Sequence, residues 1–292
     1  MIILTFITIA SYFILRTTKQ NREDQKRIED YLENHNGTNT WPTRYSYTDI
    51  NKITRNFKNQ IATRGVTLHE GMLVDGTHIV VKMIDIYDQN IEGFITEVEI
   101  IGRMQHPNVL QLIGYCVDHR KRALVYEFMH APTTLESHIT TLDEKRLHRV
   151  TLGLAKGISY VRRNLDDISP KDIFLDDSLD PKILVFPTEG TYGDVLSKKT
   201  DVFSFGMLVL EVLGRRKNEV YVFPFEWIYN EMGKKDEENE IVKKLTIVGL
   251  WCIQWFPSDR PSMKCVVQML EGDKMPIMPA NPFHLNGKNE LF

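Results

Sequence analysis

The hydrophobic pattern of this chain changes its period between the two halves, and this change limits the folds that the chain can adopt. The first half holds short runs of apolar, mostly β-branched residues, which are typical of strands. These runs lie at residues 66–68, 72–73, 78–84, 109–116 and 123–128. Asp75-Gly76 marks a hairpin turn between two of them, and residues 91–104 have a helical period. We therefore expect a mostly antiparallel sheet with one helix across it.

The second half has the period of helices. Five apolar residues form one long stripe, namely Leu147, Val150, Leu154, Ile158 and Val161. Residues 202–212 are apolar nearly all round, which predicts a buried central helix, and further helices are expected at 241–254 and 263–270. The Pro-rich end predicts a flexible tail over residues 274–292.

Charge and cysteine content exclude some classes of protein. A net charge of −3 gives no reason to expect a nucleic-acid partner. The three cysteines, Cys116, Cys252 and Cys265, are scattered and have no metal-ligand spacing. We interpret them as small core residues of a protein in a reducing compartment.

The first 15 residues carry no charge and are expected to form a transmembrane segment. A helix of this length spans about 22 Å, against about 30 Å of hydrocarbon, so it is a short span or the end of one. The alternative is a cleaved signal peptide, although a basic n-region and a small-x-small cleavage site are missing. Basic residues follow at once, at Arg16, Lys19, Arg22, Lys26 and Arg27. They predict a single-pass protein of the plasma membrane with the rest of the chain in the cytosol.

Residues 16–45 are polar, lack a hydrophobic period and are expected to be a juxtamembrane linker. Ser46 then has the features of a helix N-cap, because Asp49 follows three residues later. Ile50, Ile53 and Phe57 continue at helical spacing, so a short helix is expected to lead into the folded domain.

Taken together, a strand with VVK, a helical Glu and HPNV resemble a protein kinase. The likeness is most specific to the cytoplasmic part of plant receptor-like kinases, in the leaf-rust-resistance group. It rests on RYSYTDINKITRNF, DGTHIVVKMI, FITEVEIIGRMQHPNVLQLIGYC, KRALVYEFM, TDVFSFGMLVLEVLGRRKN, EIVKKLTIVGLWCIQWFPSDRPSM and VVQMLEG. The resemblance implies a two-lobed α+β kinase-like fold, with a β-rich N-lobe at 46–130 and a helical C-lobe at 131–273. It also implies ATP and Mg²⁺ as cofactors, and other receptor kinases or signalling proteins as partners.

The nucleotide end of such a fold is partly kept. Lys82 matches the strand Lys that holds the nucleotide phosphates, and Glu97 matches the helix Glu that holds this Lys. The alternative is a plain surface Lys and a solvated Glu. Glu127 and Met129 resemble the hinge, whose backbone binds adenine in active relatives.

The phosphate and adenine surfaces depart from the family. In IATRGVTLHEG, which stands where a kinase has G-x-G-x-x-G, Gly65 is the one glycine kept from that motif. Val80 stands where the family usually has Ala, and Phe174 where it usually has Leu. Because packed sites tolerate extra carbons poorly, we expect a filled adenine slot that binds ATP weakly or not at all.

The catalytic end lies in DISPKDIFLDDSLDPKILVFP, which predicts a hairpin with strands at 173–175 and 183–186. Asp167 matches the catalytic base and Asp172 replaces the metal-binding Asn, so Asp172 could still ligate Mg²⁺ through oxygen. Val185 replaces the metal-binding Asp of D-F-G, and valine has no ligand atom. The alternative interpretation is that both aspartates are solvated loop carboxylates beside the hairpin.

The segment after the hairpin is shortened, and the activation segment is nearly absent. Arg260 therefore loses the Glu with which it pairs in the family, and we expect it to turn outward or find another carboxylate. Asp201 is kept and is expected to cap the buried helix.

The sequence therefore favours a membrane-anchored, kinase-shaped binding module without phosphotransfer activity, a pseudokinase, that acts as a scaffold in receptor kinase signalling. The competing interpretation is an ATP-dependent Ser/Thr protein kinase with residual activity. A third is a decayed gene product without a role.

Overall fold

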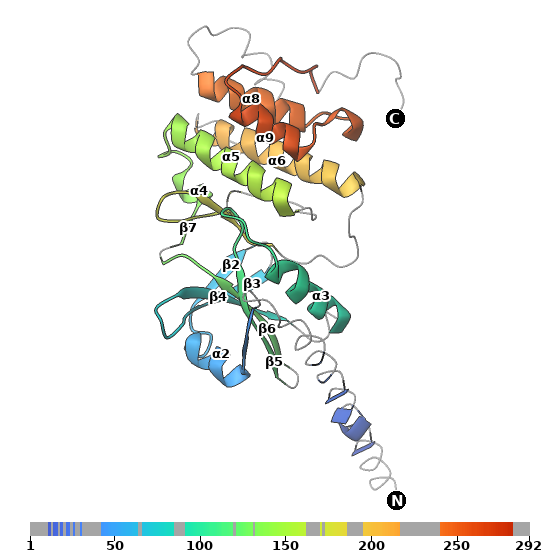
Figure 1. Ribbon diagram of the computed structural model, residues 1–292. Coiled ribbons are helices and arrows are strands. Elements are labelled where there is room, and N and C mark those ends of the chain that lie inside the picture. Colours follow the sequence, from blue (N-terminus) through green and yellow to red (C-terminus); the bar gives the residue numbers. More distant parts are fainter. Residues whose placement is uncertain are drawn as a thin grey trace, which may run out of the picture. The chain divides into compact units, whose positions relative to one another are not determined.

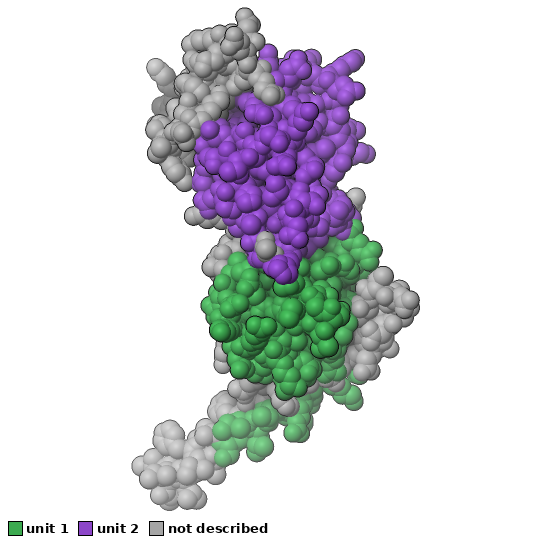
Figure 2. Space-filling view, turned by 90° about the vertical axis from the view of Figure 1, so that its left-hand side faces the viewer, with its two compact units in different colours: residues 1–105, 111–128 green, residues 106–110, 129–292 purple. Residues whose placement is uncertain are grey.

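The computed structural model describes residues 42–63, 66–84, 91–118, 121–130, 132–161, 170, 173–185, 195–216 and 240–282, and scattered residues between 11 and 30. The chain divides into two compact units, shown in different colours in Figure 2. Unit 1 comprises Met1–Gln105 and Gln111–Phe128, and unit 2 comprises His106–Leu110 and Met129–Phe292. The change of unit at Phe128 lies two residues before the lobe boundary expected from the sequence.

Unit 1 contains a six-stranded sheet in the order β1-β5-β6-β4-β3-β2 (Figure 1). Its strands are β1 Thr43–Tyr45, β2 Gln60–Thr63, β3 Val66–Met72, β4 His78–Ile84, β5 Leu112–Asp118 and β6 Lys121–Glu127. All neighbouring strands are antiparallel except β1 and β5, which are parallel. The one long helix of the described part of this unit is α3, Ile91–Gly102. The antiparallel sheet with one main helix is therefore as predicted, although one strand, β3, contains the run at 66–68 and ends at Met72 within the run at 72–73.

Strand β1 lies inside the segment that was expected to be linker. Its backbone runs beside Gly114 to Cys116 of β5 and comes very close to the glycine. A Cβ built on Gly114 would lie 2.3 Å from Cε2 of Tyr45 and 2.8 Å from the carbonyl oxygen of Thr43. Since real Cβ contacts are longer than this, only glycine fits at position 114. The linker boundary therefore moves back, and the folded part includes residues 42–45.

Helix α2, Tyr47–Ile53, begins with the predicted capping box. The Ser46 hydroxyl accepts a hydrogen bond from the Asp49 N–H at 3.1 Å, and the Asp49 carboxylate accepts one from the Ser46 N–H at 3.2 Å. The helix ends before Phe57, contrary to the helical spacing. Arg55, Asn56 and Phe57 have φ angles of 51°, 58° and 57°, and this left-handed turn returns the Phe57 ring to the core beneath α2.

Unit 2 is mainly helical. Its helices are α4 Leu135–His138, α5 Glu144–Val161, α6 Val195–Arg216, α8 Glu240–Cys252 and α9 Met263–Glu271, with a short 3-10 turn at Pro257–Asp259. Most apolar side chains of these helices form the main core, which includes four of the five residues of the stripe predicted on α5; the fifth, Val161, is also buried. A small sheet adds β7 Thr133–Thr134, β8 Ile173–Leu175 and β9 Pro181–Ile183. The predicted hairpin is present, but its second strand begins two residues earlier.

Two expectations concern the ends of the chain, and the structure describes only part of each end. None of the described helices has the length and apolarity needed to cross a lipid bilayer. Most of the segment 1–15 lies outside the described residues. At the other end, the side chains of Trp251 in α8 and of Gln254 just beyond α8 donate hydrogen bonds to residues 277 and 280 of the expected flexible tail. Residues 283–292 lie outside the described residues.

Candidate functional site

Lys82 lies on β4, where it faces Leu68 of β3 and Leu124 of β6 across the sheet. The side chain is half-buried. Glu97 lies in α3 between the buried residues Phe94 and Val98, and its side chain is outside the described part. Both residues belong to unit 1, and their ion pair stays a prediction.

Val80 is packed from every side within this sheet. It faces Tyr126 of β6 in the register, and both side chains are 0% exposed. The extra carbons that valine carries relative to alanine are therefore part of a filled interior. Position 80 offers no open surface to a flat ring in this structure.

Glu127 is the last residue of β6 and is exposed. Its N–H donates to the carbonyl oxygen of Gln111 at 2.9 Å, and the next N–H, that of Phe128, donates to the oxygen of His78 at 2.8 Å. Met129, the other predicted hinge residue, is half-buried and belongs to unit 2. Adenine binding by these two residues stays a prediction.

The two predicted catalytic carboxylates, Asp167 and Asp172, lie outside the described residues. The hairpin that follows them is described and has an apolar interior. Phe174 on β8 is 1% exposed, and Val185, just beyond β9, is 0% exposed. Val185 is thus fully buried, and its hydrocarbon side chain offers no ligand atom.

Backbone hydrogen bonds tie β9 to the HPNV segment at 106–109. The Ile183 N–H donates to the Asn108 oxygen at 2.9 Å, and the Leu110 N–H donates to the Ile183 oxygen at 2.9 Å. The Asn108 side chain adds a third bond, from Nδ2 to the Pro181 oxygen at 3.0 Å. Strand β9, which leads to Val185, is therefore held by this segment along one edge and by β8 along the other.

The donor set of this hairpin does not fit Mg²⁺ at the D-F-G position. Mg²⁺ requires oxygen ligands in octahedral geometry, whereas the Val185 side chain is hydrocarbon and fully buried. Among the residues that the structure describes, no cluster of three or more His, Cys, Asp or Glu side chains could hold a metal ion. No catalytic step through Mg²⁺ at Val185 follows from this geometry.

His106 of the HPNV segment has a structural role that the motif alone did not reveal. Its ring stacks on Tyr160, with centroids 4.9 Å apart, and Nδ1 accepts a hydrogen bond from the Asn108 N–H at 3.1 Å. Burial lowers the pKa of His106, and the nearby Lys156 and Lys182 lower it further. The ring is therefore a neutral acceptor that shapes the segment holding β9.

Arg260 has hydrogen-bond partners that the sequence did not predict. It neither turns outward nor meets a carboxylate among the described residues. Nε donates to the Gln254 oxygen at 2.7 Å, Nη1 to the Lys199 oxygen at 3.0 Å and Nη2 to the Trp255 oxygen at 3.2 Å. The guanidinium also stacks on Phe203 at 4.6 Å, and its burial lowers its pKa. Backbone carbonyls and a ring thus replace the missing Glu.

Asp201 is buried, at 4% exposed, but does not cap α6. The helix begins at Val195, so Asp201 lies in its second turn and the predicted N-cap role is wrong.

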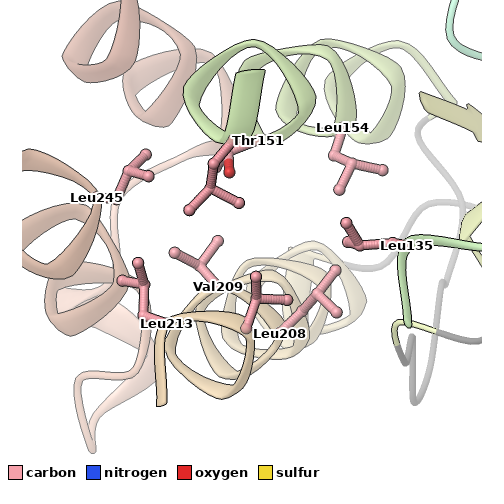
Figure 3. Close-up of a pocket in the computed structure, with 9 residues that line it drawn as sticks. Leu135, Thr151, Leu154, Leu208, Val209, Leu213 and Leu245 are labelled. Atoms are coloured by element: carbon pink, nitrogen blue, oxygen red, sulfur yellow. The ribbon is translucent and has the colours of Figure 1, made fainter. Parts of the chain in front are cut away.

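A small cavity lies in unit 2 between α4, α5, α6 and α8 (Figure 3). Its volume is about 10 Å³, and Thr151 is the one polar side chain among the leucines and valines that line it. A single water needs about 10–15 Å³ and several polar partners, so this cavity is a packing gap and holds no cofactor.

Comparison with known proteins places this geometry in context. Residues 64–183 match the family described as protein tyrosine and serine/threonine kinase. The chain is 34% identical, over 85% of its length, to the leaf rust 10 disease-resistance locus receptor-like protein kinase-like 2.2 of Arabidopsis thaliana. It is 33% identical, over 98% of its length, to the rust resistance kinase Lr10 of Triticum aestivum. These alignments cover 48% and 54% of the two relatives, so the chain spans about half of their length.

Proposed function

Since the chain belongs to the protein kinase family, among the plant receptor-like kinases of the leaf-rust-resistance type, we propose that it is a pseudokinase. In this proposal the kinase fold is kept as a binding module that presents its surfaces to an active receptor kinase or to a substrate. Regulation would then act by a shift between conformations instead of by phosphoryl transfer.

One observation carries the proposal: Val185, which matches the metal-binding Asp of the family by its motif, is a fully buried valine. In active relatives the metal neutralises charge on the transferred phosphoryl group, and this term dominates the catalysis of phosphoryl transfer. A positioned base such as Asp167 contributes only about 10²–10⁴-fold, so it does not compensate for the loss.

Two further features support weak nucleotide binding. The side chains of Val80 and Phe174, each larger than the residue usual in the family, are both packed to within 1% of full burial. The β2–β3 hairpin, which matches the phosphate-binding loop, has Thr63 paired with Val66, so its connection is Arg64-Gly65 with a single glycine.

The competing function, a Ser/Thr kinase with residual activity, is favoured by the retained Lys82 on a complete β4 and by the retained α3 that bears Glu97. These two positions are the ones that hold the nucleotide phosphates in the family. The two functions differ in one product, phosphate transferred from ATP.

We further propose that the chain is anchored in a membrane through residues 1–15, with the kinase-like units in the cytosol. The support is the uncharged run MIILTFITIASYFIL and the basic residues that follow it. Carbonate-resistant retention in the membrane fraction, lost when the run is replaced by polar residues, tests this part of the proposal separately.

Radiolabelled ATP with the purified full chain separates the two activities. We expect no phosphate incorporation above that of the Lys82→Met variant, either into the chain or into a general substrate such as myelin basic protein. Incorporation that Lys82→Met abolishes would establish the residual kinase and overturn the pseudokinase.

A further inference from the structure

The segment after α9 has a proline at every third position. Pro276, Pro279 and Pro282 fix their own φ angles, and each proline also biases the preceding residue toward extended backbone. Residues 275–282 are therefore strongly biased to polyproline II, a helix with three residues per turn and no internal hydrogen bonds. Residues that lie three apart share one face of such a helix. The segment 272–282 is named the strap below.

The burial of the strap follows this period of three. Pro279 and Pro282 are buried, whereas Ile277 and Ala280 are exposed, Ile277 to 83%. Met278, next to the exposed Ile277, packs against a second apolar cluster of unit 2. This cluster is separate from the main core. It is formed by residues of α6, of α8 and of the turn directly after α8, namely Phe203, Met207, Leu210, Leu250 and Ile253. One face of the strap is thus docked and the other faces outward.

The hydrogen bonds to the strap have the same spacing. Nε1 of Trp251 donates to the Ile277 oxygen at 2.8 Å, and Nε2 of Gln254 donates to the Ala280 oxygen at 3.0 Å. Both acceptors are three residues apart, as are both donors. Lys244, earlier on α8, donates to the Gly272 oxygen, so the strap runs along α8 in the same direction as the helix (Figure 1, dark red coil beyond α9).

Gln254 shows that this contact is built into the fold. Its side chain is 7% exposed, and its amide N–H groups donate to the Leu250 oxygen and to the Ala280 oxygen, each at 3.0 Å. Removal of the strap would leave one of these donors without its acceptor, and a donor that loses its partner is costly.

A polyproline II ligand is recognised by side-chain donors that hold carbonyl oxygens one turn apart, beside an apolar surface. Here the donors are an indole N–H and a side-chain amide. We propose that α6, α8 and the two residues directly after α8, Ile253 and Gln254, form a polyproline II recognition surface, and that the strap of the same chain is its resident ligand. The ligand class is a peptide with proline at every third residue and a large apolar residue before the middle proline. This inference is independent of whether the chain binds ATP.

The test uses full-length chains and a fluorescent peptide of the strap sequence, KMPIMPANPF. Met278→Asp/Pro279→Gly releases the strap, because it places a charge against the apolar cluster and removes the middle proline. Ile277→Asp is the matched control, since it adds the same charge to the neighbouring exposed side chain. Thermal unfolding first establishes that the three chains are folded.

We expect the peptide to bind the released chain at least about tenfold more tightly than it binds the wild-type and Ile277→Asp chains, because a tethered ligand has a local concentration of about millimolar. Trp251→Phe in the released chain should weaken binding by about 2- to 12-fold, the effect of one neutral hydrogen bond. A peptide with its prolines moved out of the period of three should bind at least tenfold more weakly than the strap peptide.

Equal binding to the wild-type and released chains, or equal binding of the rearranged peptide, would overturn the proposal. A wild-type dimer that forms by exchange of straps would contradict the assignment of the strap to its own chain. If the released chain does not fold, hydrogen exchange of the wild-type indoles decides. The Trp251 N–H should exchange more slowly than that of Trp255, which is 65% exposed, and equal rates would refute the docked strap.

Discussion

Arg260 provides the sharpest stability test, because its three hydrogen bonds end on backbone carbonyls. Each bond is worth about 0.5–1 kcal/mol where water competes for a half-buried group. The contact with Phe203, at 4.6 Å, adds about 0.5–1 kcal/mol. Arg260→Met keeps most of the apolar stem and removes these contacts, so we expect a loss of about 2–4 kcal/mol. In thermal unfolding of the full chain this corresponds to a decrease in Tm of roughly 3–7 °C.

Two comparisons distinguish this arrangement from an ion pair. Arg260→Lys keeps the charge but loses the planar fork, so about half of the stability loss should remain. The loss for Arg260→Met should also be the same at low and at high salt, because carbonyl groups carry no net charge to be screened. A change of less than about 0.5 kcal/mol for Arg260→Met, or a loss that disappears at high salt, would refute the assignment to backbone carbonyls.

Three further predictions follow from the packing of unit 2. Gly206→Ala should lower the free energy of unfolding by about 1–3 kcal/mol, because the new Cβ would lie 2.5 Å from Cβ of Cys252. Gly214→Ala in the same helix is the control, since its Cβ meets no described atom within 4 Å and should stabilise the chain by up to about 1 kcal/mol. Equal changes in Tm for the two variants would contradict this prediction. Because the pKa of His106 is lowered in the folded chain, its contribution to stability is present above the unfolded pKa of about 6.5 and is lost as the pH falls below that value. His106→Gln should therefore reduce the loss of Tm between about pH 7 and about pH 5. An unchanged pH dependence of Tm would refute the role of His106 as a neutral acceptor. Val185→Asp should lower the free energy of unfolding by about 3–5 kcal/mol, because it places a carboxylate at a fully buried position. Added Mg²⁺ should not restore the Tm of this variant. A Tm that rises with Mg²⁺ would show that the position is open to metal.

The regular elements could be predicted because their signals are local. The capping box at Ser46, the stripe on α5 and the hairpin turn at Asp75-Gly76 each depend on residues within a few positions of one another. The structure has all three. Hydrophobic period and turn residues therefore sufficed for four of the six strands of unit 1 and for the long helices of unit 2.

The differences arise where a distant part of the chain decides the conformation. Strand β1 has three residues and exists because Gly114, about 70 positions later, allows its close approach. Phe57 has the correct helical spacing, yet it reaches the core through a left-handed turn because α2 ends at Ile53. Such features have no signature in a short sequence window.

At the candidate site, too, the residue replacements could be predicted from the sequence, whereas their packing and partners could not. The replacement at Val185 could be identified from the sequence, but its complete burial required the packing of the hairpin. The partner of Arg260 could not be predicted, because backbone carbonyls leave no residue-type signal. The period of three in the prolines is a usable signal for the strap, whereas the proline content alone predicts only a flexible tail.

The central claim is that this kinase-family chain no longer binds the Mg-ATP on which phosphoryl transfer depends, and a binding measurement on the full chain tests it most directly. Thermal unfolding with Mg-ATP at micromolar to millimolar concentration, beside Lys82→Met, reports binding because a ligand at 100 times its Kd stabilises by about 2.7 kcal/mol. We predict the same Tm with and without micromolar Mg-ATP, for the wild type and for the variant. A clear increase in Tm at micromolar Mg-ATP that Lys82→Met abolishes would contradict the account.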